Sequence, residues 1–442
     1  PKPTISGSFY QGGTVKANEG TWVPAASGYA YQWYRDGKAI SGATAKTYKL
    51  TASDSGKKLT VKVTASAPGV ASKSATSASK TLSKFFTKIG SPYISGTVKV
   101  GKTVTAAKGT WSPTPSSYSY QWYRDGVAIS GATKSTYKLV AADAGKKLTV
   151  KVTAKRSGYA SQPKTSAAKT VAKGTFSTAP TPKISGTVKV GKTVSVTVGT
   201  WSPSASFTYQ WYRSGTAISG ATSKSYKLVA ADAGKKLTVK VTAKKSGYTS
   251  KSKTSAAATV AKGTFSTAPT PKISGTVQVG KTVSVTVGTW SPTPSSYSYQ
   301  WYRDGKAISG ATKSTYKLVA SDAAKKLTVK VTAKKSGYTS KSKTSAAKTV
   351  AKATFTTAPA PTISGTLKVG STLTATPGTW SPTPSSFTYQ WYRGDTAISG
   401  ATKATYKLVS ADKGKTIKVK VTAKKSGYTN KAKTSVKTTA IK

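Results

Sequence analysis

The acidic side chains are too few and too scattered to build a catalytic or metal site. The chain of 442 residues has ten Asp and Glu and no His, Cys or Met. Each stretch of about 90 residues holds one to three carboxylates, and we expect no paired general acid and base, and no oxygen cage for calcium, within one stretch. For the five carboxylates that recur at one place we predict a role in turns or caps through side-chain hydrogen bonds. These are Asp54, Asp143, Asp232, Asp322 and Asp412.

Nucleophilic catalysis is also disfavoured. Without His or Cys, only Lys could activate a Ser or Thr, and Ser and Lys are so frequent here that neighbours arise by chance. The sequence has no Gly-x-Ser-x-Gly elbow and no Gly-rich loop that would cradle a phosphate ahead of a helix. The lack of Cys rules out disulfides and thiolate metal sites. We therefore predict a protein that is not an enzyme and that uses no metal or cofactor.

Aromatic and basic residues offer a different chemistry, the stacking of a sugar ring or base. A Trp in the motif Gly-Thr-Trp, together with an outward Tyr and a nearby Lys, could form a ligand platform. The alternative is that this Trp packs over the end of a hydrophobic core, and the sequence leaves both interpretations open. The candidate platform residues are Trp111, Tyr123 and Lys151, with Trp201, Tyr212 and Lys240, and Trp290, Tyr302 and Lys330.

The charge balance is extreme. The chain has 70 Lys and Arg against 10 Asp and Glu, which leaves a net charge of +60. Such a surface attracts polyanions over about 8 Å in physiological salt, and teichoic-type wall polymers, nucleic acid and acidic polysaccharides are all candidates. A second interpretation is that the charge serves only solubility and self-repulsion.

These residues recur because the chain consists of five copies of one unit. The period is 89 to 90 residues, and Gln-Trp-Tyr-Arg occurs once in each copy. The Trp of this motif is Trp33, Trp122, Trp211, Trp301 and Trp391. The second Trp of each copy is Trp22, Trp111, Trp201, Trp290 and Trp380.

Alternating side chains within each copy predict β-strands. In residues 118–124 the Trp122 side chain shares a face with Tyr118 and Tyr120, and residues 148–152 alternate in the same way. We expect Trp122 to anchor a core with one buried and one solvated sheet face. Residues 140–145 could form either one helical turn or a loop, and we favour the loop. About seven short strands with regular turns predict an antiparallel two-sheet sandwich.

Proline-containing segments join the copies, as in KGTFSTAPTPKISG from Lys173. Alternating Pro residues favour extended, stiff geometry, and the one aromatic that recurs in these joints could pack between domains. Five sandwiches in line would span on the order of 200 Å. The opening residues PKPTISG match the second half of a joint, so we expect further sequence upstream in the gene product. The joint aromatics are Phe86, Phe176, Phe265 and Phe355.

The order Trp-Tyr-Arg-Asp-Gly, then Ile, then Thr-Tyr-Lys-Leu, then Asp-x-Gly resembles the immunoglobulin-like superfamily, and it covers all five copies. The motifs Gly-x-Thr-x-Lys-Val-Gly-x-Thr, Gly-Thr-Trp and Tyr-Gln-Trp-Tyr-Arg resemble the Ig-like repeats of actinobacterial secreted and surface proteins. The chain departs from the antibody pattern, because it lacks both Cys and has Lys147 where a Tyr corner needs a Tyr. Ser214 and Gly394-Asp395 also alter the turn after Gln-Trp-Tyr-Arg in the third and fifth copies.

We therefore expect an all-β protein with five tandem Ig-like antiparallel β-sandwiches in an elongated array. The expected domains are 1–84, 85–174, 175–263, 264–353 and 354–442. The resemblance favours a non-catalytic extracellular stalk or adhesin-like array at the cell surface, which spaces a partner domain and contacts an anionic cell-wall polymer or polysaccharide. The alternative is an accessory binding-module array that targets an upstream catalytic domain to wall or polysaccharide. Nucleic acid would bind only non-specifically, and no apolar run approaches the roughly 18 residues of a membrane span.

Overall fold

Each copy folds into two antiparallel sheets packed face to face. The computed structural model describes residues 2–442. The second domain contains β9 (Tyr93–Ser95), β10 (Thr103–Ala107), β11 (Ser117–Arg124), β12 (Val127–Ala128), β13 (Thr136–Lys138), the 3-10 helix η2 (Ala141–Asp143), β14 (Lys147–Lys155), β15 (Gln162–Thr165) and β16 (Lys169–Thr170). One sheet has the order β13-β10-β9, and the other has the order β12-β11-β14-β15, with β16 also paired to β14. This is the strand order of an immunoglobulin-like sandwich, and the five repeats share it, except that within residues 2–442 the fifth has no counterpart of β16.

The other domains repeat these elements. The first contains β1 (Thr4–Gly7), β2 (Thr14–Asn18), β3 (Gly28–Arg35), β4 (Lys38–Ala39), β5 (Thr47–Lys49), η1 (Ala52–Asp54), β6 (Lys58–Ala67), β7 (Val70–Thr76) and β8 (Lys80–Thr81). The third contains β17 (Lys183–Ser185), β18 (Thr193–Thr197), β19 (Ser206–Arg213), β20 (Thr216–Ala217), β21 (Ser225–Lys227), η3 (Ala230–Asp232), β22 (Lys236–Lys244), β23 (Lys251–Thr254) and β24 (Ala258–Thr259).

The two last domains follow the same order. The fourth contains β25 (Lys272–Ser274), β26 (Thr282–Thr286), β27 (Ser296–Arg303), β28 (Lys306–Ala307), β29 (Thr315–Lys317), η4 (Ala320–Asp322), β30 (Lys326–Lys334), β31 (Lys341–Thr344) and β32 (Lys348–Thr349). The fifth contains β33 (Thr362–Ser364), β34 (Thr372–Thr376), β35 (Ser386–Arg393), β36 (Thr396–Ala397), β37 (Thr405–Lys407), η5 (Ser410–Asp412), β38 (Ile417–Lys424) and β39 (Lys431–Thr434).

The Trp of Gln-Trp-Tyr-Arg is the centre of each core, as predicted. Trp122 is fully buried, its ring stacks on Tyr137 at a centroid distance of 5.7 Å, and its Nε1 donates to the Lys134 carbonyl at 2.9 Å. Strand β14 turns Leu148, Val150 and Val152 towards the same core. The two-residue period thus gives one buried and one wetter face.

Residues 140–145 differ from the favoured loop. Ala141–Asp143 form the short 3-10 helix η2, and the same turn recurs in all five domains. The Asp143 carboxylate accepts a hydrogen bond from the Val140 backbone N–H at 2.7 Å, which closes the turn. The capping role predicted for the recurring Asp is therefore present, but it is made on a helix.

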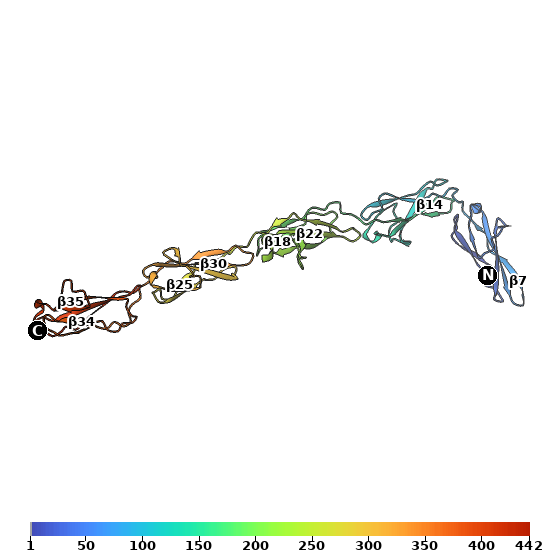
Figure 1. Ribbon diagram of the computed structural model, residues 1–442. Helices are drawn as coiled ribbons and strands as arrows, with labels where there is room; N and C mark the ends of the chain where they lie inside the picture. The colour runs from blue at the N-terminus through green and yellow to red at the C-terminus, as the bar shows by residue number, and fades with distance from the viewer. Residues whose placement is uncertain (1) are drawn as a thin grey trace.

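The domains form an extended row with one bend, which lies between the first and second domains (Figure 1). The second to fifth domains follow one another nearly in line. The core of the first domain includes Phe85, which the expected boundary assigns to the second domain. The array is therefore elongated, as predicted, but it is not straight throughout.

A Tyr from each following domain fastens the joints between the second and fifth domains. Tyr248, in the loop between β22 and β23, packs against the core of the second domain. A Cβ atom added to Gly174 would lie 2.5 Å from the Tyr248 ring, so in this joint the ring takes the space that a side chain would need. Gly174 donates to the Gly247 carbonyl at 2.9 Å and accepts from the Thr249 N–H at 3.0 Å. Tyr338 and Tyr428 pack against the third and fourth domains at the matching joints, where the joint residues are Gly263 and Ala353.

The joint aromatics lie beside the interdomain contact, but they do not enter the core of the preceding domain. Phe176 packs within the third domain, on Trp201 at 5.5 Å and beside Tyr248 at 5.8 Å. The interdomain contact comes instead from Tyr248, which packs both beside Phe176 and against the core of the second domain. The Phe therefore supports the Tyr, and the Tyr holds the neighbouring domain.

Candidate polyanion-binding surface

The outer face of the larger sheet carries the outward Lys and Tyr side chains. In the second domain β11 and β14 pair over eight residues, with Gln121 opposite Lys151 and Tyr123 opposite Thr149. Tyr123 and Lys151 are therefore diagonal neighbours on one face. Lys151 Nζ lies 5.6 Å from the centre of the Tyr123 ring, within the range of a cation–π contact.

The third and fourth domains place their candidate pairs at the same register. Tyr212 lies opposite Thr238, and Lys240 lies opposite Gln210. Tyr302 and Lys330 occupy the matching positions on β27 and β30. The structure therefore brings the Tyr and Lys of each predicted set onto one sheet face.

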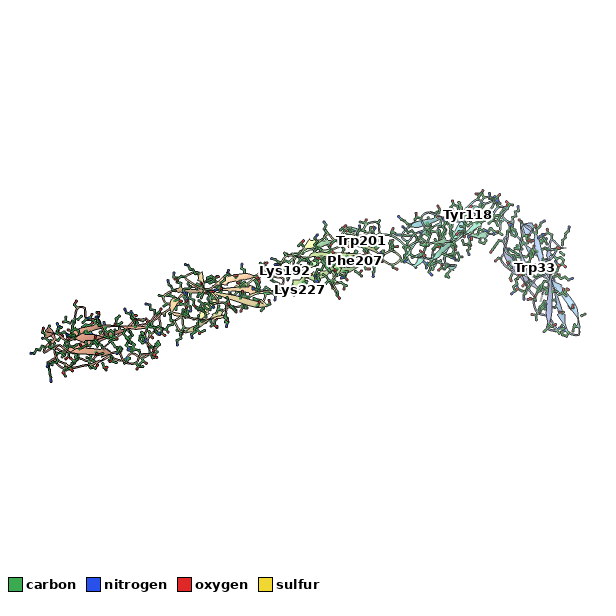
Figure 2. All side chains as sticks on the ribbon, viewed as in Figure 1. Trp33, Tyr118, Lys192, Trp201, Phe207 and Lys227 are labelled. Carbon is green, nitrogen blue, oxygen red and sulfur yellow. The ribbon has the colours of Figure 1, made fainter. Side chains whose placement is uncertain are left out.

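The second Trp of each predicted set lies elsewhere. Trp111, Trp201 and Trp290 are 5%, 6% and 4% exposed. Trp201 packs edge-on against Phe207 at 5.7 Å, at the end of the third domain that faces the second (Figure 2). The three Trp rings are thus buried by the joint segments and present no open face to a ligand. This agrees with the packing interpretation, and it removes the Trp from any exposed platform.

Basic residues outnumber the carboxylates sevenfold, and the imbalance is more pronounced at the surface because every carboxylate is paired with a basic side chain. Five Asp are fully buried against an Arg, in pairs such as Arg124 Nε to Asp143 at 2.7 Å. The other carboxylates pair with Lys at the surface, as Asp125 does with Lys146 at 2.9 Å and Glu19 does with Lys46. The excess of +60 is therefore carried by basic side chains that have no acidic partner. The buried pairs are Arg35–Asp54, Arg124–Asp143, Arg213–Asp232, Arg303–Asp322 and Arg393–Asp412.

Sequence reasoning missed the role of this Arg. Asp143 accepts hydrogen bonds from Arg124, from the Tyr137 hydroxyl at 3.1 Å and from the Val140 N–H. The hydrogen bond to Asp143 raises the pKa of Arg124, and burial beside the carboxylate raises the pKa of Tyr137. Both side chains therefore stay protonated at neutral pH, and the Asp143 carboxylate is fully buried beneath its three donors. A usable signal was present, since Arg and Asp keep the same separation of 19 residues in all five copies.

The turn after Gln-Trp-Tyr-Arg also holds its carboxylate tightly. Asp125 adopts a φ of 47°, and its side chain accepts the Lys147 backbone N–H at 2.8 Å. This backbone hydrogen bond, followed by Lys146, lowers the pKa of Asp125. Asp125 is therefore charged at neutral pH, but it is already committed to the turn.

Clusters of metal-ligating side chains and membrane-spanning helices are both absent from the described residues. Across residues 2–442 no three His, Cys, Asp or Glu side chains lie close enough to hold a metal ion. Nor does any helix in the described part have the length and apolarity needed to cross a bilayer.

The outermost strand of the larger sheet carries inward Lys residues. In the third domain Lys253 lies opposite Val241 and Lys251 lies opposite Ala243, so both share the side of β22 that faces the core. Charged residues pointing inward at an edge strand oppose pairing with another sheet edge. These Lys residues therefore protect the array against edge-to-edge association, in addition to adding charge.

Among known proteins, only solved structures resemble this chain. No family model matches the chain, and no curated protein matches it. Among solved structures, Sidekick-1 immunoglobulin domains 1–5 are 15% identical, with a TM-score of 0.21, and the match covers 98% of this chain and 94% of that one. An ice-binding adhesin of an Antarctic bacterium is 14% identical with a TM-score of 0.28, over 79% of this chain and 99% of that one. The ICAM-5 D1–D4 fragment is 15% identical with a TM-score of 0.31, over the same shares. At these values the similarity gives no functional information about the chain.

Proposed function

We propose that the chain is a non-catalytic extracellular stalk or adhesin-like array, which spaces a partner domain from a surface and contacts anionic envelope polymers through its Lys-rich surface. The observation that carries the spacing role is the Tyr-fastened joint, which recurs between the second, third, fourth and fifth domains. Each such joint combines a packed ring with two backbone hydrogen bonds, so neighbouring domains are held by more than a linker. The proposed spacing function thus depends on the length that these joints give to the array.

The contact role rests on the charge distribution. Each domain repeats an outward Lys on the middle strand of its larger sheet, and no carboxylate is left without a basic partner. Several weak sites on one rod can bind a long polymer by avidity, provided that the polymer reaches them together. The resemblance to actinobacterial repeats favours a Gram-positive envelope, with teichoic-type polymer as the ligand.

Binding to purified cell walls tests the contact role. The full chain should be retained at low salt and released as salt rises, because charge attraction is screened within about 3 Å at 1 M salt. Walls stripped of their anionic polymer serve as the matched control and should retain much less protein. Equal retention on both wall preparations would contradict the proposed ligand.

A triple variant locates the surface. Lys151→Gln, Lys240→Gln and Lys330→Gln together should lower the salt needed for release, because they remove one outward charge from each of three domains. A variant with Lys102→Gln, Lys192→Gln and Lys281→Gln, at exposed positions outside the larger sheets, changes the net charge equally and serves as the control. If both variants release at the same salt concentration, net charge and not this sheet face determines binding.

The second candidate function is an accessory array that targets an upstream catalytic domain to wall or polysaccharide. The Tyr–Lys pairs on the outer sheet face favour it, because aromatic rings beside cations suit sugar recognition. Retention that persists at 1 M salt would support this candidate over the charge-driven one. Non-specific nucleic-acid binding would show a steep salt dependence in a gel-shift assay.

A further inference from the structure

In four of the five domains a joint Phe covers the second Trp. The ring distances are 5.7 Å for Phe86–Trp111, 5.5 Å for Phe176–Trp201, 5.4 Å for Phe265–Trp290 and 5.4 Å for Phe355–Trp380. In the third domain the Phe lies on Trp201 above a fully buried Ala243, with Tyr248 on its other side. The second Trp and the buried Ala thus form a packing site for the Phe ring, which we call the aromatic seat. It is a repeated part of the fold.

The segment that carries the Phe also pairs through its backbone. Ser177 donates to the Ser202 carbonyl at 2.9 Å, and Ser202 donates to the Thr178 carbonyl at 3.2 Å. The same antiparallel bridge recurs at Ser112, Ser291 and Ser381. The Phe segment is thus bound both by a ring and by a short strand-like contact.

The first domain has the same aromatic seat at Trp22, but no Phe among residues 2–442 stacks on this Trp. Trp22 is held as its counterparts are, with Nε1 donating to the Glu19 carbonyl at 2.9 Å, but its ring is only half-buried. Ala65 lines the same pocket as Trp22, and it matches Ala243, which packs with Phe176 in the third domain. Val23, at the position of Ser202, is 95% exposed and makes no backbone hydrogen bond with any of residues 2–442.

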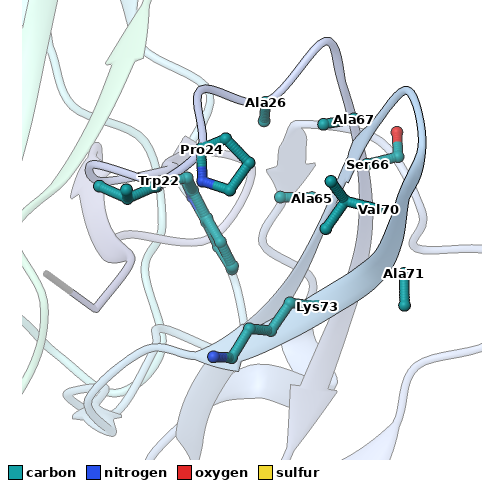
Figure 3. Close-up of a pocket in the computed structure, with 10 residues that line it drawn as sticks. Trp22, Pro24, Ala26, Ala65, Ser66, Ala67, Val70, Ala71 and Lys73 are labelled. Carbon is teal, nitrogen blue, oxygen red and sulfur yellow. The ribbon is translucent and has the colours of Figure 1, made fainter.

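The hairpin beside this seat also differs. Val70 stands where Tyr248 stands in the third domain, and it is 52% exposed. The result is a pocket lined by the Trp22 ring, Pro24, Ala65, Val70 and the Lys73 side chain (Figure 3). Figure 3 shows the Trp22 ring standing between Pro24 and the hairpin that carries Ala65 and Val70.

We propose that this end of the first domain binds an extended segment of the type Gly-Thr-Phe-Ser-Thr-Ala, which is the sequence at 263–268. The Phe side chain sits on Trp22 above Ala65, and the residues after it pair with the Val23 backbone. A second copy of the chain is a poor donor, because Phe176 and Phe265 are only 6% and 9% exposed and already fill their own seats. The occupant is therefore a free segment of this class.

Acrylamide quenching of Trp fluorescence in the full chain tests the proposal. The other nine Trp are at most 6% exposed, so Trp22 supplies the quenchable signal. The capped peptide Gly-Thr-Phe-Ser-Thr-Ala should protect Trp22, and the matched peptide with Ala in place of Phe should bind about tenfold more weakly or worse, because it lacks the buried ring. The variant Trp22→Phe should lose the quenchable signal, which verifies its source.

A gain-of-function variant sharpens the test. Val70→Tyr restores the ring that lies 5.4 Å to 5.9 Å from the joint Phe in the other four domains, and it should tighten peptide binding about two- to tenfold. In a second measurement the same segment is fused ahead of residue 1, which raises its effective concentration into the millimolar range. Equal quenching of the Phe and Ala fusions would overturn the proposal, whatever the outcome of the cell-wall assay.

Discussion

Replacing Asp143 by Asn should destabilise the second domain more than any change at the surface carboxylates. Asp143 is fully buried, and it accepts the Arg124 Nε at 2.7 Å, the Tyr137 hydroxyl at 3.1 Å and the Val140 N–H at 2.7 Å. Asn has the same size as Asp but carries no charge. Its NH2 group is a hydrogen-bond donor and would face groups that are themselves donors. Arg124 then loses its counterion.

The magnitude follows from these contacts. Removing one partner of a buried ion pair costs about 3–5 kcal/mol. The Arg124 side chain is 29% exposed, so water partly restores its solvation and the lower value, about 3 kcal/mol, applies. In a domain of about 90 residues each 1 kcal/mol shifts the melting temperature by about 4–8 °C, so we expect the second domain to melt about 12–24 °C lower.

Differential scanning calorimetry of the full chain provides the measurement. The heat of one domain should separate from the main transition and move to lower temperature. Asp125→Asn is the matched control, because Asp125 lies in an exposed turn, its ion pair with Lys146 is solvated, and Asn also tolerates a positive φ. If both variants lower the transition equally, the buried pair contributes no more than the turn, and the reasoning from burial is wrong.

Two further predictions concern the stiffness of the joints and the stability of the first domain at acidic pH. Tyr248→Ala should loosen the joint between the second and third domains, and small-angle scattering should show a broader distribution of lengths, whereas Tyr212→Ala on the outer sheet face should leave the scattering unchanged. The ion pair with Lys46, with a hydrogen bond from Tyr31, lowers the pKa of Glu19 to about 2 from an ordinary value of 4.5. Glu19 therefore stabilises the folded first domain above pH 4.5, by on the order of 1 kcal/mol after solvent screening, and this contribution is lost as the pH falls from 4.5 to 2. The difference in melting temperature between the native chain and Glu19→Gln should shrink across that interval, and a constant difference would contradict it.

Much of the fold was predictable because one repeated pattern determines it. The strict alternation around Trp122 and along residues 148–152 decides which face is buried, and five copies make the pattern hard to misjudge. The loop expected at residues 140–145 was wrong because the turn depends on the Asp143 side chain. The sequence shows that Asp recurs, but not that its carboxylate folds back onto the Val140 N–H.

The joints were only partly predictable. Pro and Phe are visible in the joint itself, whereas the residue that holds the neighbour, Tyr248, lies more than seventy residues later in the loop between β22 and β23. Local patterns cannot indicate such a contact, because it needs the sandwich to be folded first. The recurring triplet Ser-Gly-Tyr was the available signal, and Val70 interrupts it in the first copy alone.

The bend after the first domain follows from the residues at its joint. Lys84 stands where Gly174 stands in the next joint, so a Tyr ring cannot lie on it as Tyr248 lies on Gly174. Phe85 fills the core of the first domain instead, and Gln162 of the second domain donates to the Gln11 carbonyl at 3.1 Å. The backbone pairing is retained while the packing changes, and the domain therefore leans in a new direction (Figure 1). In the proposed stalk the four aligned domains supply the reach, and the first domain, with its open Trp22 seat, points away from their axis.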